Sequence, residues 1–277
     1  MHARIPTTLE TIQNARLHAN KKLGQHFLTD EMLLSSIVRC AALPMGVHAI
    51  EIGSGPGGLT RALLAEDHVA HLTAIELDVR CVVALQPLME HYPQRFTLHQ
   101  RDALDVRLHD LTPAPRAVVA NLPYNVGTTL IIHWLKEIAT YGADVVDSIT
   151  VMLQKEVVER MVARPDSADY GRFSILCQWL CEVDYCMDVP PEAFTPPPAV
   201  MSSVVRLVPR AQPAFAASWE EVEAFTHAAF AQRRKMLRKN LLAWRSDAVE
   251  RMEACSIDPT RRAETLTQKE IATLLIK

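Results

Sequence analysis

The sequence predicts a two-part α/β protein: a doubly wound, mostly parallel sheet with an antiparallel last strand, followed by a small helical domain. Short apolar segments alternate with amphipathic ones from residue 47 onward. The apolar segments are nearly continuous, as in strands that helices cover on both faces. After residue 209 the segments have a helical pattern, and no further strand candidate occurs.

The predicted elements follow one another in strand–helix order, which is typical of βαβ units. The expected strands are VHAIEI (47–52), LTAIEL (72–77), FTLH (96–99), RAVVAN (116–121), SITVML (148–153) and a final pair, VDYCMDV (183–189) and SVVRLV (203–208). The expected helices cover residues 59–66, 80–90, 128–138, 155–163 and 170–180.

We expect three parts in the chain: an N-terminal arm (1–22), the sheet domain (23–208) and the helical domain (209–277). The arm is basic, and we expect it to be flexible; a mitochondrial presequence is the alternative. Its charged residues are Arg4, Arg16, Lys21 and Lys22 against Glu10. A proline-containing linker, VPRAQPAFAASW, marks the second boundary.

Composition excludes several classes of protein. The net charge of −3 excludes a uniformly basic coat, so any nucleic-acid surface must be local. No apolar run reaches the roughly 18 residues of a membrane helix, and no secretory leader opens the sequence. The six cysteines form no C-x-x-C pair, so we expect reduced thiols in a cytoplasmic protein and no metal site.

A glycine-rich turn, EIGSGPGG (51–58), lies between the first strand and the first helix. Glycines there permit a tight turn and let a ligand approach the backbone at a helix N-terminus. The positions of Gly53, Gly55 and Gly58 fit G-x-G-x-x-G, and Glu76 ends the second strand about 20 residues further on. An acid there accepts hydrogen bonds from ribose hydroxyls. The pattern predicts an adenosine-type cofactor and leaves NAD and S-adenosylmethionine open.

Two acids favour S-adenosylmethionine. Glu51 precedes the first glycine by two residues, where it can meet a cationic methionyl group but would repel a pyrophosphate. Asp102 follows the third strand, where it can accept a hydrogen bond from an adenine amino group; a helix-capping role is the alternative. A nicotinamide dehydrogenase is disfavoured by Glu51 and by the lack of an obvious hydride-transfer constellation.

The fourth strand ends in Asn121, Leu122, Pro123 and Tyr124, at the edge where doubly wound sheets bind ligands. A plain turn is one interpretation. The other interpretation is a site for methyl transfer to adenine N6. The N6 lone pair is delocalised into the ring, so this amine is a poor nucleophile and needs hydrogen-bond acceptors that localise the lone pair. The Asn121 amide oxygen and the Leu122 carbonyl can accept both N–H hydrogens, Pro123 stiffens the turn, and Tyr124 offers a ring for stacking.

A second ring would complete a clamp on the base. Phe194, in the proline-rich loop PPEAFTPPPAV (190–200), is expected to be exposed and to take this role; ordinary loop packing is the alternative. Stacking contributes about 1–3 kcal/mol per base. The target base must be single-stranded or flipped out to enter such a pocket.

Taken together, these residues resemble one known family over nearly the whole chain: the S-adenosylmethionine-dependent ribosomal RNA adenine N6,N6-dimethyltransferases. The motifs stand in the family order. They are KKLGQHFL, EIGSGPGGLT, IELD, DAL, NLPYN, QKEVVERM, YGRFS and FTPPPAVMSSVV. NLPY alone is a weak signal, whereas the ordered set is highly specific. The resemblance implies a Rossmann-like methyltransferase sheet.

The resemblance also implies site residues. Gln25, His26 and Leu28 would lie against the cofactor, and Tyr124 and Phe194 would flank the target base. The full set of expected cofactor residues is Gln25, His26, Leu28, Glu51, Gly53, Gly55, Glu76, Asp102, Ala103 and Asn121. The expected catalytic residues are Asn121, Leu122, Pro123, Tyr124 and Phe194.

The tail AFAQRRKMLRKNLL resembles the small-subunit enzymes of the family, which dimethylate two adjacent adenosines in the hairpin loop near the 3′ end of the small-subunit rRNA. Residues 230–262 hold nine basic residues against four acids, a local charge of +5 that can bind RNA phosphates; a solvated helix face is the alternative. The expected RNA contacts are Arg233, Arg234, Lys235, Arg238 and Lys239. The chain departs from the family pattern at Lys239 and Asn240, where the family usually has Asn and Ser, and at Ala263, where it often has Pro; these positions bear on RNA contacts or domain packing and lie outside the cofactor pocket.

The leading hypothesis is therefore a small-subunit rRNA adenine dimethyltransferase linked to late subunit assembly. Its implied substrate is a partly assembled small subunit, and we expect a monomer when free. The alternatives are an enzyme acting on large-subunit rRNA or on adenine N6 in DNA, and a binding module that checks assembly with little turnover.

Overall fold

A computed structural model describes residues 4–20 and 23–276 of the chain, with the side chain of residue 276 excepted. Its centre is a seven-stranded sheet in the order β4-β3-β2-β5-β6-β9-β7. The strands are β2 Val47–Ile52, β3 Val69–Glu76, β4 Phe96–Gln100, β5 Arg116–Asn121, β6 Ser148–Gln154, β7 Cys181–Val189 and β9 Ser202–Pro209. A separate two-stranded ribbon joins β1 (Phe27–Leu28) to β8 (Phe194–Thr195).

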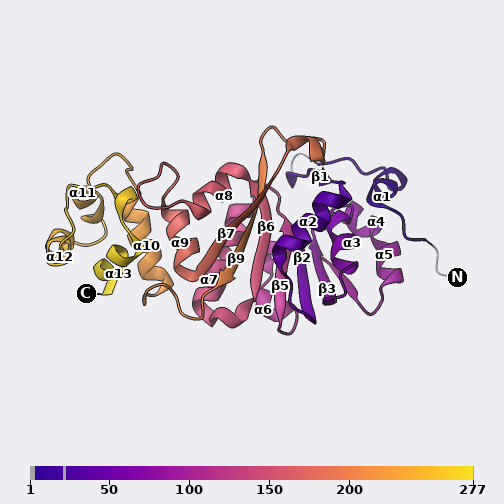
Figure 1. Cartoon of the computed structure of the whole chain (residues 1–277), viewed down its shortest axis with the longest axis horizontal. Coiled ribbons are helices and arrows are strands. Elements are labelled where there is room, and N and C mark those ends of the chain that lie inside the picture. The colour runs from indigo at the N-terminus through magenta and orange to yellow at the C-terminus, as the bar shows by residue number, and fades with distance from the viewer. Residues whose placement is uncertain (1–3, 21–22, 277) are drawn as a thin grey trace.

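Helices cover both faces of the sheet, as the apolar strands predict (Figure 1). In β5, Ala117 and Val119 face one hydrophobic cluster, and Val118 and Ala120 face the other, because successive strand residues point to opposite sides. The first cluster includes α2 (Glu31–Ala41), α3 (Gly58–Leu64) and α5 (Gln86–His91); the second includes α7 (Gly127–Tyr141), α8 (Lys155–Val162) and α9 (Arg172–Leu180).

The strand directions confirm the predicted fold class. Neighbouring strands from β4 to β6 are parallel. The last strand in the sequence, β9, inserts between β6 and β7 and is antiparallel to both. The crossover between the two halves of the sheet leaves a crevice at the carboxyl ends of the central strands, where ligands of doubly wound folds bind.

One predicted helix is wrong. Residues 80–90 were expected to form a single helix, but the structure has α4 (Val79–Ala84) and α5 with Leu85 between them. The physical reason is Pro87, which lies in the first turn of α5. Proline lacks the backbone N–H that would continue the helix and is tolerated only in such a first turn.

The expectation of a flexible N-terminal arm is also wrong for its described residues. Thr8–Asn14 form α1, which begins with a capping box between Thr7 and Glu10. Thr8, Thr11 and Leu17 are buried against the domain. Lys21 and Lys22 lie outside the described residues.

The C-terminal part is helical, as predicted, and begins directly after β9. It consists of α10 Trp219–Ala229, α11 Leu237–Leu241, α12 Ala248–Ala254 and α13 Gln268–Ile276. These helices lie beyond β7, at the end of the molecule opposite α1 (Figure 1). The two parts share one core: the Trp179 ring stacks on Phe215, and its Nε1 donates to the Phe215 carbonyl at 2.9 Å.

Short elements complete the fold: α6 Leu108–Leu111 and the 3₁₀ turns Ala103–Asp105, Ala143–Val145, Pro191–Ala193 and Ala263–Thr265. Among the described residues, none of the helices combines the length and apolar character that a membrane crossing requires.

Candidate active site

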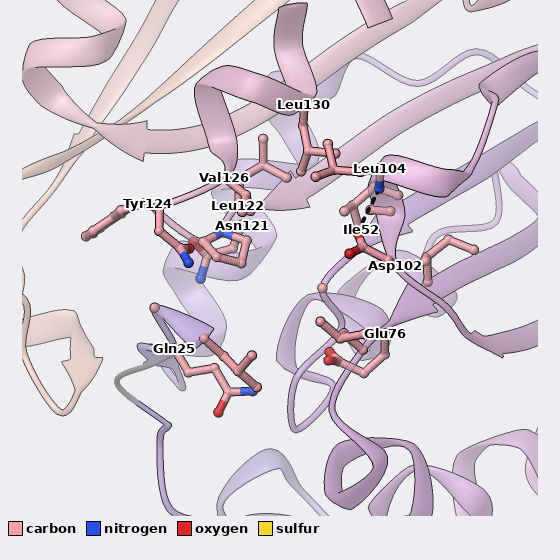
Figure 2. Close-up of a pocket in the computed structure, with 18 of the residues that line it drawn as sticks. Gln25, Ile52, Glu76, Asp102, Leu104, Asn121, Leu122, Tyr124, Val126 and Leu130 are labelled. Carbon is pink, nitrogen blue, oxygen red and sulfur yellow. Dashed lines mark hydrogen bonds between the residues drawn. The ribbon is translucent and has the colours of Figure 1, made fainter. Parts of the chain in front are cut away.

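A pocket with a cavity volume of about 160 Å³ lies at the carboxyl ends of β2, β3 and β5 and opens to solvent. Residues 23–27 of the N-terminal segment form one of its walls. Figure 2 shows Glu76 and Asp102 on one side of the pocket, and Asn121 and Tyr124 on the other. Ten of the residues expected from the sequence line it: Gln25, His26, Gly53, Glu76, Asp102, Ala103, Asn121, Leu122, Pro123 and Tyr124.

The glycine turn adopts a backbone that requires glycine. Gly53 has φ +76°, and its N–H donates to the Ile75 carbonyl at 2.8 Å. Gly57 has φ +83°, and an added β-carbon there would lie 2.5 Å from Leu85 Cδ2. L-amino acids with side chains disfavour this region of φ. At Gly53 the turn therefore presents its backbone to the pocket. At Gly57 the turn packs closely against Leu85.

Glu76 ends β3 as predicted and is held from two sides. Its Oε2 accepts from the Gly55 N–H and its Oε1 from the Asp78 N–H, both at 2.7 Å. Burial raises the pKa of Glu76, and the two backbone N–H groups oppose that rise. The carboxylate is thus oriented before any ligand binds, and each oxygen keeps a further lone pair for a ribose hydroxyl.

Asp102 combines the two roles that the sequence left open. Its Oδ1 caps the 3₁₀ turn Ala103–Asp105 by accepting from the Leu104 N–H at 2.9 Å, and the residue also lines the pocket (Figure 2). Capping occupies one carboxylate oxygen. The other remains available to an amino group in the pocket.

Asn121 and Tyr124 occupy the opposite wall. Asn121 is the last residue of β5, and its side-chain amide has no hydrogen-bond partner among the described residues. The turn after it closes through the Pro123 carbonyl, which accepts from the N–H groups of Val126 (3.1 Å) and Gly127 (3.0 Å). An amide without internal partners at the pocket wall is free to bind a ligand.

The Tyr124 side chain is held at both its ring and its hydroxyl. Its OH lies 2.5 Å from Ser202 Oγ, and its ring stacks on His26 with 5.6 Å between centroids. His26 Nδ1 in turn lies 2.8 Å from the Pro196 carbonyl oxygen. Burial raises the pKa of Tyr124 and the bond to Ser202 opposes this, so the phenol stays neutral.

Glu51 does not lie where the sequence placed it. It is 1% exposed beneath the glycine turn, where its Oε2 accepts from Thr60 Oγ1 at 2.7 Å. Burial raises its pKa to about 8. The strand register explains this: Glu51 is the penultimate residue of β2 and points into the protein below the turn. It therefore does not line the pocket that would receive a methionyl group.

Leu28 and Gly55 also lie outside the pocket lining. Leu28 is buried in β1, and Gly55 supports the pocket indirectly through its hydrogen bond to Glu76. Both positions are adjacent to residues that do line it, Phe27 and Glu76.

The expected exposure of Phe194 is wrong. The ring is 3% exposed and packs in the cluster that contains α2. The cause is β8: Phe194 pairs with Leu28 across the ribbon with β1, which turns the ring into the core. In this structure the ring that faces Tyr124 is that of His26, not Phe194.

Sequence reasoning missed two residues at this site, Ser202 and Asp78. Ser202 is fully buried on β9 and contacts a tyrosine 78 positions earlier, so no local pattern could reveal it. Asp78 caps α4 and also contacts Gln25. Its N-cap position was detectable from the sequence, but its contact across 53 positions was not.

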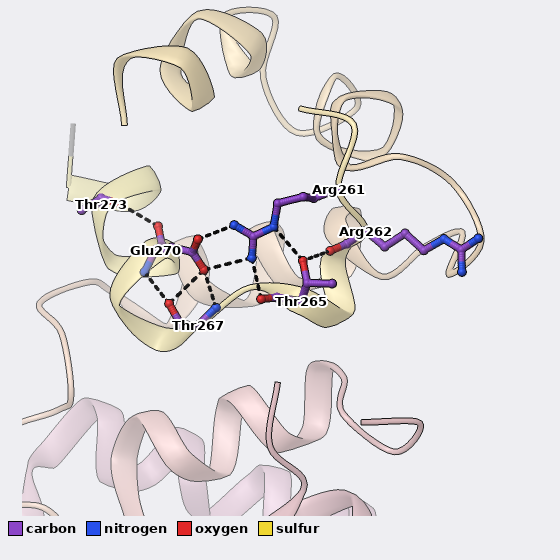
Figure 3. Close-up of polar contacts among 6 residues, drawn as sticks. All are labelled: Arg261, Arg262, Thr265, Thr267, Glu270 and Thr273. Atoms are coloured by element: carbon purple, nitrogen blue, oxygen red, sulfur yellow. Dashed lines mark hydrogen bonds and ion pairs between the residues drawn. The ribbon is translucent and has the colours of Figure 1, made fainter. Parts of the chain in front are cut away.

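The nine basic residues between positions 230 and 262 fall into two groups. Five of the nine are in ion pairs: Arg233 and Arg262 with Glu264, Arg245 and Arg251 with Asp247, and Arg261 with Glu270. Figure 3 shows Arg261 turned toward Glu270 and Thr265, while Arg262 extends away from them. The other four are exposed and form no ion pair among the described residues: Arg234, Lys235, Arg238 and Lys239. We call these four the basic segment.

The chain matches known proteins over almost its full length. The family model for ribosomal RNA adenine dimethylase matches residues 16–276. Proteins described as ribosomal RNA small subunit methyltransferase A are similar to it. That of Rhodospirillum rubrum is 46% identical over 270 residues, covering 98% of this chain and 91% of the relative. That of Brucella suis is 47% identical over 273 residues, covering 98% and 96%.

Solved structures show the same fold. A dimethyladenosine transferase from Plasmodium falciparum superposes with a TM-score of 0.77 at 21% identity, covering 91% of this chain and 96% of that one. The 23S rRNA methyltransferase ErmE superposes with a TM-score of 0.67 at 23% identity, covering 90% and 98%. The chain therefore belongs to the ribosomal RNA adenine dimethylase family, whose members are methyltransferases of the kind that use S-adenosylmethionine.

Proposed function

We propose that this enzyme dimethylates N6 of two adjacent adenosines in the hairpin loop near the 3′ end of small-subunit rRNA, in four methyl transfers. The identity of 44–47% to small-subunit methyltransferases supports the choice of subunit. The observation that carries the chemistry is the pocket wall at Asn121, where an amide without internal partners lies across from the ordered acids Glu76 and Asp102.

The ordered acids fit S-adenosylmethionine. Glu76 would accept hydrogen bonds from the two ribose hydroxyls, and Asp102 one from the adenine amino group. The backbone at Gly53 permits close approach of the methionyl part, and Gln25 and His26 would close the pocket from the N-terminal side. Bound there, the cofactor supplies a methyl group on a positively charged sulfur, which keeps the C–S electron pair when the methyl group leaves.

The opposite wall fits a target adenine. The Asn121 amide oxygen and the Leu122 carbonyl would accept the two N6–H hydrogens, which localises the nitrogen lone pair and aims it at the methyl carbon. Tyr124, fixed by Ser202, would stack on the base. N6 loses one proton to water for each methyl group gained. A hairpin loop supplies the unpaired base that such a pocket requires.

The helical part, residues 209–277, would act as the recognition domain for the substrate. The basic segment is exposed and its charges are free for RNA phosphates, and Arg233 would join it if its pair with Glu264 opened. A partly assembled small subunit, bound by a monomer late in assembly, is the substrate that we propose. The main domain, residues 23–208, would carry out the transfer.

The test is transfer of tritiated methyl groups from S-adenosylmethionine to undermethylated small subunits, followed by identification of the modified nucleosides. We expect dimethyladenosine with the wild type. Asn121→Ala should lower kcat about 10²- to 10³-fold, the cost of removing one preorganised hydrogen-bonding group in other enzymes. Asn14→Ala, on the exposed end of α1, is the matched control and should leave kcat unchanged.

Other outcomes would point elsewhere. Transfer to large subunits or to DNA, with none to small subunits, would replace the proposed substrate. Tight subunit binding without transfer, despite retained cofactor binding, would favour a protein that checks assembly.

A further inference from the structure

A buried carboxylate, Asp78, connects the proposed ribose acid to the N-terminal wall of the pocket. Asp78 is 7% exposed and does not line the pocket. Its backbone N–H donates to Glu76 Oε1 at 2.7 Å, and its Oδ2 accepts from Gln25 Nε2 at 3.0 Å. One residue thus contacts both the acid on one side of the pocket and the N-terminal segment that forms the adjacent wall.

Arg80 strengthens this connection. Its Nη2 and Nε donate to the two oxygens of Asp78 at 2.6 and 3.0 Å, and its Nη1 donates to the His18 carbonyl at 3.3 Å. Gln25 Oε1 accepts from the Asn20 N–H at 2.9 Å, which is a hydrogen bond within the N-terminal segment. The Arg80 guanidinium, and then the Gln25 amide, hold the pKa of Asp78 below its usual value. The carboxylate is therefore charged at neutral pH.

A second contact holds the same segment from the glycine turn. Arg61, on α3 directly after the turn, donates from Nε to the Pro6 carbonyl at 2.9 Å and from Nη2 to Thr11 Oγ1 at 2.8 Å. Its Nη1 donates to the Gly57 carbonyl at 2.7 Å. Arg61 thus holds the start of the N-terminal segment against the helix that follows the glycine turn, while Asp78 and Arg80 hold its later part at Gln25 and His18.

We propose that Asp78 is a positioning residue: it holds residues 18–20 and 23–25 against the pocket, and the affinity for S-adenosylmethionine depends on it although it does not touch the ligand. The inference rests on the proposed cofactor roles of Glu76 and Gln25. Its physical basis is preorganisation, because a wall that is ordered in advance does not lose its conformational freedom on binding. A wall ordered only part of the time lowers the apparent affinity by the fraction of competent molecules.

The test compares Asp78→Asn with Asp30→Asn. Asparagine at position 78 can still cap α4 through its Oδ1, but its NH₂ group replaces Oδ2, which accepts hydrogen bonds from both Gln25 and Arg80. Asp30 is also an N-cap, of α2, and is exposed without contact to the N-terminal wall, which makes it the matched control.

Binding of S-adenosylmethionine is measured by titration calorimetry on the full chain. Asp78→Asn should raise Kd about tenfold, the size expected for lost hydrogen bonds to a charged group, and Asp30→Asn should leave it unchanged. KM for the cofactor should rise in parallel, with kcat within about twofold of wild type at saturating cofactor, because the reacting groups are untouched.

Hydrogen exchange separates positioning from general destabilisation. In Asp78→Asn, the amides of residues 18–20 and 23–25 should exchange faster, while those of α7 keep their wild-type rates. Equal acceleration in α7 would reject a positioning role. A wild-type Kd in Asp78→Asn would reject the inference and leave the proposed function standing. Failure of the wild type to bind S-adenosylmethionine would remove the proposed cofactor site, and the inference with it.

Discussion

The pocket and the basic segment use charge in opposite ways. In the pocket, Glu76 is buried and accepts two backbone hydrogen bonds before any ligand arrives. In the basic segment, Arg234, Lys235, Arg238 and Lys239 are exposed and have no ion-pair partner in the part of the chain that the structure describes. The first arrangement holds a few atoms in fixed directions; the second leaves charges free to meet phosphates in many directions.

This difference indicates how each region would recognise its ligand. Buried, hydrogen-bonded acids discriminate by geometry, and salt screens them little. Exposed cations attract an anionic polymer at longer range, release its counterions and give binding that falls steeply with salt. The enzyme would thus bind its cofactor by shape and its RNA largely by charge.

Removing charge from the basic segment should have the largest effect of the variants that test this comparison between the pocket and the basic segment. Arg234→Gln with Lys235→Gln should weaken binding to the small subunit about tenfold and reduce the salt slope of log K by about 2, because two phosphate contacts are lost. Filter binding over a range of salt measures both quantities. The Kd for S-adenosylmethionine should not change.

Arg245→Gln is the matched control, because Arg245 lies in the same helical part but is paired with Asp247 at 2.6 Å. If this variant reduced affinity and salt slope as much as the double variant, the contrast between free and paired cations would not hold.

A smaller effect is expected at Ser202, which fixes Tyr124. Ser202→Ala should raise KM for the subunit about threefold to tenfold, the value of one ordinary hydrogen bond, with little change in Kd for the cofactor. Tyr124→Phe removes the same bond, so the double variant should be no worse than Tyr124→Phe alone.

Ser203→Ala provides the control for this prediction. Ser203 is equally buried on β9, but its hydroxyl donates to Asp188 at 2.6 Å rather than to Tyr124. Equal increases in KM from the two serine variants would indicate a general effect on the strand.

The smallest effect concerns pH and Glu51. Burial raises the pKa of Glu51 from 4.5 to about 8, so between these values the folded protein keeps a proton that the unfolded chain releases. The contribution of Glu51 to the free energy of unfolding is therefore fully present below pH 4.5. It is lost as the pH rises from there through about 8, by an amount on the order of a few kcal/mol at most.

Glu51→Gln removes the titrating group and should flatten this fall. Thermal melts from pH 5 to pH 9 measure it: the wild type should lose more thermal stability toward pH 9 than the variant. Parallel curves would mean that Glu51 is ionised in the folded protein at neutral pH.

Much of the fold follows from local pattern. The apolar strands, the glycine turn and the acid at Glu76 predicted a doubly wound sheet and an adenosine-type pocket, and the fold class is confirmed. Local pattern was less successful where a single residue redirects the chain: Pro87 divides one predicted helix into two, and the Thr7–Glu10 capping box begins a helix in a segment expected to be flexible.

What the sequence determined by itself was most of the strands and helices of the sheet domain, the position of the glycine turn and the residues at strand ends, because these depend on neighbours a few positions apart. Only the tertiary structure decided which side chains face the pocket. Pairing of β8 with β1 buries Phe194, the register of β2 buries Glu51, and contacts across 53 and 78 positions join Gln25 to Asp78 and Tyr124 to Ser202. The physical reason is that burial and long-range pairing belong to the packed molecule, and no short stretch of sequence encodes either.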